Sequence, residues 1–467
     1  MISKVKNAMS TLVGGMMPHG HHQHHGSGNV HHQNCHQDGL PPRFPYGRPE
    51  FLDLTPELLQ YSTEHASRPV LTLKRDSRLP WRTGYAETIN AGKSMLNEDQ
   101  ASCELLYVKK LSSKKQRNST LLDDNGDGTG IPLQYWGVFD GHAGSGCAIM
   151  ASKLLHRLIR DRLGDIAHLL ENPSVMPPIC LAKNGSPYQV EVKKGANSTQ
   201  DPEDPNAITD PSIRFHTEKT VSLESLIMGI IENAFKQMDE LIEKEKTSFT
   251  ISGGCCALAA IHLMGKLYVA NAGDSRAIII RNDEVFPMSN EFTPESERQR
   301  LQYLGLLRPE LLGNEFTHLE FPRRIQHKEL GKKMLFRDHT MNGWAYKTII
   351  EDDLKFPLIY GEGKKVIVYD MSEYKHGPND VLVMGTDGLW DVTTDREVAD
   401  AVSGFLSCCE PTDPVRYTLA AQDLLMRSRG VLKERGWRLP NERLGSGDDI
   451  TCYVIPLAGP AGPETET

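Results

Sequence analysis

Four short stretches of the sequence place an aspartate beside a glycine, next to an apolar run. The first is 133–142, which ends in Asp140, Gly141 and His142. The other three contain Asp274, Asp387 and Asp448. One Asp-Gly pair is a weak signal, because the same dipeptide is common in turns. Four such stretches in one chain predict a metal site built from oxygen ligands.

Three of these carboxylates are the strongest candidates for metal ligands. Asp140, Asp387 and Asp448 each follow or end an apolar strand, so we expect their side chains to meet at one end of a sheet. Hard oxygen ligands without histidine or cysteine favour Mg²⁺ or Mn²⁺ over zinc. Gly141 could add its backbone carbonyl, since no side chain stands in the way.

Such a site has a definite chemistry. Two ions about 4 Å apart would hold a bridging water and lower its pKa enough to supply hydroxide near neutral pH. His142, two residues after Asp140, could then protonate a leaving oxygen. Hydrolysis of a phosphate monoester is the reaction that suits this set. The alternative treats each Asp-Gly as a turn and each aspartate as a helix cap, and it stays open for Asp391 and Asp449 taken singly.

The apolar pattern predicts strands joined by short turns, with helices grouped between them. The predicted strands are 101–108, 133–139, 253–261, 266–272, 275–281, 380–386 and 450–457. Apolar side chains at three- and four-residue spacing predict helices at 145–170, 223–245, 395–406 and 413–427. The close succession of strands between 253 and 281 predicts a β-meander. This order favours an α+β fold with antiparallel sheets.

Bulk composition narrows the class of protein. The chain has 467 residues, of which 39% are hydrophobic and 24% charged, as in soluble globular proteins. A net charge of −9 argues against general nucleic-acid binding. The sequence contains neither a long apolar run typical of a transmembrane helix nor a signal peptide. Nine cysteines without C-x-x-C spacing favour reduced thiols. We therefore expect a cytoplasmic protein.

The first 40 residues form a histidine-rich segment that we expect to be disordered. Within 1–16, apolar residues recur at helical spacing beside lysines. This pattern fits a basic amphipathic helix that makes peripheral contact with a membrane, and it fits a frayed terminus equally well.

The main domain is predicted at 83–457 and is preceded by an extended arm at 41–82. Its polar stretch 184–218 is read as an insertion, and 290–364 as an irregular functional flap. Residues 458–467 form a tail.

Six short motifs follow one another along the main domain, at 97–99, 139–144, 252–254, 272–276, 386–391 and 448–450. In order and spacing they resemble the metal-dependent protein serine/threonine phosphatases of type 2C, and the resemblance spans about 83–457. Flanking stretches resemble the 1H/1J subgroup of that family; these are 43–51, 315–324 and 436–438.

The resemblance implies a four-layer αββα sandwich, in which helices flank two packed antiparallel sheets and the metals lie at one end. It implies metal ligands at Asp140, Gly141, Asp387 and Asp448. Phosphorylated proteins would be the substrates, and the flap at 290–364 would lie beside the site.

The same resemblance implies roles for four further residues. Glu98 would hold metal-bound water and His142 would be the general acid. Asp274 with Asp391 would help to hold a weaker third ion.

One departure from the family pattern concerns phosphate binding. The family usually has an arginine four residues before the glutamate of its first motif, whereas this chain has Ser94 there, beside Lys93. A lysine supplies a point charge but no bidentate fork, so Lys93 is the candidate for phosphate binding.

A second departure is an absent segment. Between the flap and the Thr-Asp-Gly strand, the family carries a further strand and loop with a Leu-Gly-Asp type motif. Here 360–365 runs directly into 366–370. Loss of an interior strand would leave neighbouring backbone groups unpaired. Two hypotheses result, an active phosphatase and a catalytically impaired variant that acts as a binding or regulatory protein.

Overall fold

The computed structural model describes residues 40–109, 130–175, 222–293, 296–311, 316–323, 325–336, 338, 341, 345–357 and 365–459. The predictions for the histidine-rich segment with its amphipathic helix, for the insertion at 184–218 and for most of the tail lie outside these residues. No helix of the described part is long and apolar enough to cross a membrane.

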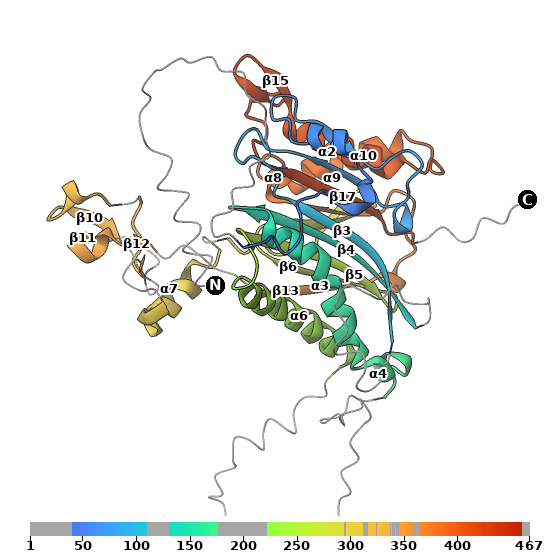
Figure 1. Cartoon of the computed structure of the whole chain (residues 1–467), viewed down its shortest axis with the longest axis horizontal. Coiled ribbons are helices and arrows are strands. Elements are labelled where there is room, and N and C mark those ends of the chain that lie inside the picture. The colour runs from blue at the N-terminus through green and yellow to red at the C-terminus, as the bar shows by residue number, and fades with distance from the viewer. Residues whose placement is uncertain are drawn as a thin grey trace, which may run out of the picture.

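Two antiparallel sheets form the centre of the molecule (Figure 1). One sheet has the strand order β1 (Val70–Thr72), β2 (Gly84–Thr88), β17 (Ile450–Pro456), β14 (Val381–Gly385), β7 (Arg276–Arg281) and β8 (Glu284–Pro287). The other has the order β13 (Lys365–Asp370), β6 (Lys266–Ala272), β5 (Gly254–Leu263), β4 (Ile131–His142) and β3 (Gln100–Val108).

The strand β14 shows why these sequences form central strands. Successive side chains of a strand point to opposite faces. Leu382 and Met384 accordingly belong to the apolar cluster between the two sheets, whereas Val381 and Val383 belong to the cluster under the helices. Both faces are buried, so the strand is apolar throughout instead of alternating.

Helices cover the outer face of each sheet, which confirms the predicted αββα sandwich (Figure 1). The five-stranded sheet is covered by α3 (Gly146–Gly164) and α6 (Leu223–Glu245), and the six-stranded sheet by α9 (Asp395–Ser407) and α10 (Arg416–Arg429). The single helix predicted at 145–170 is wrong. The backbone N–H groups of Asp165 and Ile166 donate to the carbonyls three residues before them instead of four. The helix α3 therefore ends there, and α4 (Ala167–Glu171) is a separate short helix.

The predicted β-meander is wrong at its last step. Strands β5 and β6 form a hairpin, but β7 pairs with β14 and β8 in the other sheet. The crossing is made at Gly273, whose φ of 122° lies in the left-handed region that favours glycine. The side-chain amide of Asn271 donates to the carbonyls of Gly273 and Ser275 at 3.1 and 2.9 Å and so fixes the bend.

The strand β13 forms one edge of the five-stranded sheet, at the point where the sequence departs from the family pattern. All six residues of β13 pair antiparallel with β6, from Lys365 opposite Asn271 to Asp370 opposite Lys266. Val366 joins the core under the helices, and Ile367 packs against the core between the sheets. No open ladder therefore remains at β6.

The region 296–357 contains short elements around a small apolar cluster of Phe321, Ile325 and Ile349, whereas we expected it to be irregular throughout. It lies to the left of the sandwich in Figure 1. Its elements are α7 (Arg298–Leu307), η3 (Pro309–Leu311), β9 (Phe316–Thr317), η4 (His327–Glu329), β10 (Lys333–Phe336), β11 (Ala345–Thr348), η5 (Glu351–Leu354) and β12 (Phe356–Pro357).

Short elements complete the described chain. Before the first strand come η1 (Glu50–Leu52) and α2 (Pro56–Tyr61). Between or after the strands of the sandwich lie η2 (Pro80–Arg82), η6 (Met371–Glu373), α8 (Asp387–Trp390), β15 (Val431–Lys433) and β16 (Gly436–Arg438).

Candidate metal centre

Three carboxylates meet at one end of the sandwich. Oxygen atoms of Asp140, Asp274 and Asp387 all lie within 4.8 Å of one another, and each residue is half-buried. Asp140 lies near the end of β4, Asp274 at the crossing after β6, and Asp387 at the start of α8 after β14. The two sheets thus supply this cluster jointly, because β4 and β6 belong to one sheet and β14 to the other.

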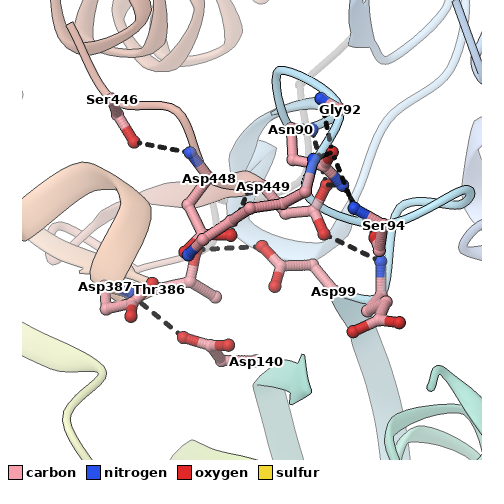
Figure 2. A network of polar contacts seen from close by, with 12 residues as sticks. Asn90, Gly92, Ser94, Asp99, Asp140, Thr386, Asp387, Ser446, Asp448 and Asp449 are labelled. Atoms are coloured by element: carbon pink, nitrogen blue, oxygen red, sulfur yellow. Dashed lines mark hydrogen bonds and ion pairs between the residues drawn. The ribbon is translucent and has the colours of Figure 1, made fainter. Parts of the chain in front are cut away.

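The electrostatics of this cluster are unfavourable without a cation. Burial, followed by the nearby Asp387, raises the pKa of Asp140 well above its usual range. Burial, followed by the charge of Asp448, raises the pKa of Asp387 to about 7. In the described part of the chain, only one backbone N–H donates to the carboxylates of Asp140 and Asp387. It is the N–H of Asp387, which donates to Oδ2 of Asp140 at 3.3 Å (Figure 2). Crowded oxygen ligands with few donors fit a hard divalent cation.

The other two predicted ligands lie beside this cluster. Asp448 accepts an ion pair from Lys93, whose side chain is 65% exposed. Asp391 ends α8, and burial together with the charge of Asp274 raises its pKa. Neither residue belongs to the group of three within 4.8 Å among the described residues.

Gly141 has no room for a side chain. A Cβ atom at this position would lie 2.2 Å from the carbonyl oxygen of Glu98. The glycine therefore brings the end of β4 against the loop that carries Glu98.

Asp449 holds that loop in place, a role that the sequence analysis left undecided. Its carboxylate accepts the backbone N–H of Glu98 at 2.9 Å and the backbone and side-chain amides of Asn90 at 2.7 and 3.0 Å (Figure 2). Burial and the neighbouring charge of Asp449 raise the pKa of Glu98 to about 7. Asp449 is therefore a positioning residue for Glu98.

Asn90 fixes the other half of the same loop. Its side-chain oxygen accepts the backbone N–H groups of Gly92, Lys93 and Ser94 at 2.9, 2.7 and 3.2 Å (Figure 2). This turn is a common use of asparagine and directs Lys93 toward Asp448.

Arg48 reaches the loop from the N-terminal arm, and no local signal pointed to it. Its guanidinium donates to the carbonyls of Asn97 and Asp99 at 3.1 and 2.7 Å, on either side of Glu98. It also forms a two-pronged ion pair with Glu87 at 2.6 and 2.7 Å, and both side chains are almost fully buried. The arm is thereby tied to the backbone that carries Glu98.

His142 lies at the exposed end of β4. Its ring packs over Gly254 of β5, where a Cβ atom would lie 2.6 Å from Nε2 of the imidazole. The pairing of β4 with β5 therefore determines where the imidazole lies relative to Asp140.

Comparison with known proteins identifies the family. The sequence model described as "Protein phosphatase 2C" matches residues 206–426, which include Asp274 and Asp387. Protein phosphatase 1H of Homo sapiens is 52% identical over 512 aligned residues, which cover 98% of this chain and 99% of that protein. The chain belongs to the protein phosphatase 2C family.

The 1H/1J resemblance is confirmed as well. Protein phosphatase 1J of Mus musculus is 51% identical over 454 residues, covering 89% of this chain and 86% of that protein. The solved Mycobacterium tuberculosis serine/threonine phosphatase PstP/Ppp matches with a TM-score of 0.31 and 13% identity, over 80% of this chain and 96% of that chain, and is too distant to support the assignment. As a 2C phosphatase, the protein is a metal-dependent protein serine/threonine phosphatase.

The alignment with the human 1H protein includes positions that this chain lacks. It spans 512 positions with the human 1H protein, whereas this chain has 467 residues, so at least 45 of those positions carry no residue of this chain.

Proposed function

We propose that this protein phosphatase 2C hydrolyses phosphoserine and phosphothreonine monoesters in proteins with two Mg²⁺ or Mn²⁺ ions. Asp140, Asp387 and Asp448 would hold the ions together with the Gly141 carbonyl. Asp274 and Asp391 would hold a weaker third ion. The observation that carries the proposal is the group of three carboxylates within 4.8 Å, with raised pKa values at Asp140 and Asp387.

When bound, such ions would lower the pKa of a water molecule and so supply hydroxide near neutral pH. The chain's own residues would do the rest. Glu98 would orient the water, and its raised pKa suits proton exchange near neutrality. His142 would donate a proton to the leaving oxygen of the serine or threonine.

Lys93 would attract the phosphate. Its ammonium contacts Asp448, so it would have to share its charge between that carboxylate and the substrate. Its side chain is 65% exposed, which leaves it accessible to a phosphoprotein. A lysine binds phosphate as a point charge, without the fixed geometry of an arginine.

The alternative is a catalytically impaired variant that acts as a binding or regulatory protein. The observation in its favour is that at least 45 positions of the alignment with the human 1H protein carry no residue of this chain. The full pairing of β13 with β6 and the converged carboxylates favour the active enzyme.

Phosphate release from a phosphothreonine peptide distinguishes the two. We expect the monomeric protein to release phosphate with Mn²⁺ and to stop with chelator. Asp140→Asn should lower kcat by about 10³-fold, because several kcal/mol of transition-state stabilisation depend on the metal. Asp53→Asn, at an exposed aspartate, is the matched control. Release that persists in chelator or in Asp140→Asn would contradict the proposal. A monomer that melts cooperatively but releases no phosphate would establish the alternative.

A further inference from the structure

Two cysteines from distant parts of the chain meet beside the metal centre. Cys147 lies in the first turn of α3, and Cys255 is the second residue of β5. Their sulfur atoms are 3.6 Å apart, although 108 residues separate them in sequence. Nothing in the local sequence pattern brings these two residues together.

The backbone around this pair is already held together. The N–H of Cys147 donates to the carbonyl of Ser252 at 3.0 Å, and the N–H of Gly146 donates to the hydroxyl of Ser252 at 3.2 Å. A disulfide requires sulfurs about 2.05 Å apart. The two sulfurs therefore need to approach by only about 1.5 Å, a distance that small side-chain and backbone adjustments can supply.

A small cavity beside the two sulfur atoms gives a small oxidant room to bind. It has a volume of about 40 Å³ and is lined by both cysteines and by α6 side chains that include Phe235 and Met238. A cavity above roughly 10–15 Å³ holds a water molecule, so this one admits a molecule of the size of hydrogen peroxide.

We propose that Cys147 and Cys255 form an oxidation site that closes to a reversible disulfide and lowers phosphatase activity. One thiolate attacks peroxide, the O–O bond breaks, hydroxide leaves and a sulfenic acid forms. The second thiol attacks the sulfenic sulfur, the S–S bond forms and water leaves. The hydroxide takes up the proton that the first thiol released when it became a thiolate, so the two sulfurs lose two electrons and one peroxide becomes two waters.

The effect on activity follows from the neighbours of Cys255 and rests on the proposed function. On one side, Gly254 carries the ring of His142. On the other side, the thiol of Cys256 donates to Oδ1 of Asp274 at 3.2 Å. A bond that pulls Cys255 toward α3 displaces both contacts and with them the proposed proton donor and a proposed metal ligand.

The test treats the reduced full chain with hydrogen peroxide, removes the peroxide with catalase, and maps the disulfides by mass spectrometry. We expect joined peptides that contain Cys147 and Cys255 and separate on reduction. Phosphate release should fall in proportion to the joined fraction and recover with dithiothreitol. Cys147→Ala and Cys255→Ala should lack the joined peptides and keep their activity under the same treatment.

Cys408→Ala is the matched control, because Cys408 is exposed at the end of α9 and should not affect the joined peptides. Oxidation of Cys408 in the wild type without joined 147 and 255 peptides would overturn the proposal. So would joined protein of undiminished activity. Absence of phosphate release from the reduced protein would instead contradict the proposed function, because the peptide map does not depend on activity.

Discussion

A cluster of three aspartates and the single Asp449 lie at the same end of the sandwich and differ in the hydrogen-bond donors around their carboxylate oxygens. The first is the cluster of Asp140, Asp274 and Asp387, whose oxygens lie within 4.8 Å of one another. In the described part of the chain, its donors are the N–H of Asp387 and the thiol of Cys256. The second is Asp449, which is only 5% exposed and accepts three N–H groups.

This difference in hydrogen-bond donors distinguishes two roles of aspartate, a structural role and metal binding. Burial raises the pKa of Asp449 to about 6, but three N–H groups stabilise its charge, and it holds the loop of Glu98. The cluster concentrates negative charge with few donors, which is unfavourable until a cation binds. The number of donors therefore distinguishes Asp449 from the cluster of Asp140, Asp274 and Asp387.

Glu87 belongs with Asp449 as a compensated carboxylate. It is fully buried, and its charge is neutralised by Arg48. Tyr85 adds a hydrogen bond from its hydroxyl. Arg48 in turn donates to the carbonyls that flank Glu98.

The largest effect on stability should come from removing the Arg48 side chain that neutralises the buried charge of Glu87. Arg48→Ala leaves the Glu87 charge buried without its partner and should lower the free energy of unfolding by about 3–5 kcal/mol. Chemical denaturation measures it. Lys74→Ala is the control, because its ion pair with Asp53 is exposed and should be worth less than about 1 kcal/mol. Equal losses in the two variants would contradict the contrast between buried and exposed charge.

A second prediction concerns the pH dependence of the metal-free protein. Burial and neighbouring carboxylates raise the pKa values of Asp387 and Glu98 to about 7, well above those of an unfolded chain. The folded state therefore binds more protons than the unfolded state between about pH 4 and pH 7, and stability falls as pH rises through that window. We expect a loss on the order of 3 kcal/mol, measured by denaturation in chelator.

Asp387→Asn should make this pH dependence shallower, because it removes one of the carboxyl groups whose pKa is raised. A metal-free protein that gains stability between about pH 5 and pH 7 would contradict the crowding of charge in the cluster.

A smaller loss should follow the removal of a compensated charge. In Asp449→Asn, one carboxylate oxygen becomes an NH2 group that accepts no hydrogen bond, so either the N–H of Glu98 at Oδ2 or the two N–H groups of Asn90 at Oδ1 lose their acceptor. Loss of such charge-assisted bonds should cost about 1–3 kcal/mol. Thermal unfolding in chelator measures it, and an unchanged melting temperature would show that the three donors do not depend on the charge.

The smallest effect has the opposite sign. Asp387→Asn removes a charge from the crowded cluster and should raise the stability of the metal-free protein by about 1 kcal/mol. The same thermal measurement compares it directly with Asp449→Asn. A destabilised Asp387→Asn in chelator would place Asp387 with the compensated carboxylates.

The sequence predicted the features that depend on local residue patterns. Strands such as β14 and β17 are apolar runs, and Asp140 and Asp387 follow or end such runs, so both the sandwich and the converging carboxylates could be anticipated. The family motifs carried the assignment, which the 1H and 1J relatives confirm.

What the sequence could not reveal depends on distant contacts. Arg48 acts on residues about fifty positions away, and Cys147 meets a partner 108 positions away. Strand β7 changes sheets because of the bend at Gly273, which local pattern cannot distinguish from a hairpin turn. The role of Asp449 depends on three donors that only the folded loop brings together.

The thermal response to Mn²⁺ tests the central claim most directly. Ligand at about a hundred times its dissociation constant should stabilise the full chain by about 2.7 kcal/mol, seen as a rise of several degrees in melting temperature near neutral pH. The rise should disappear in Asp387→Asn and persist in Asp53→Asn. Equal melting temperatures with Mn²⁺ and with chelator, or an undiminished rise in Asp387→Asn, would contradict a metal site at the crowded aspartates.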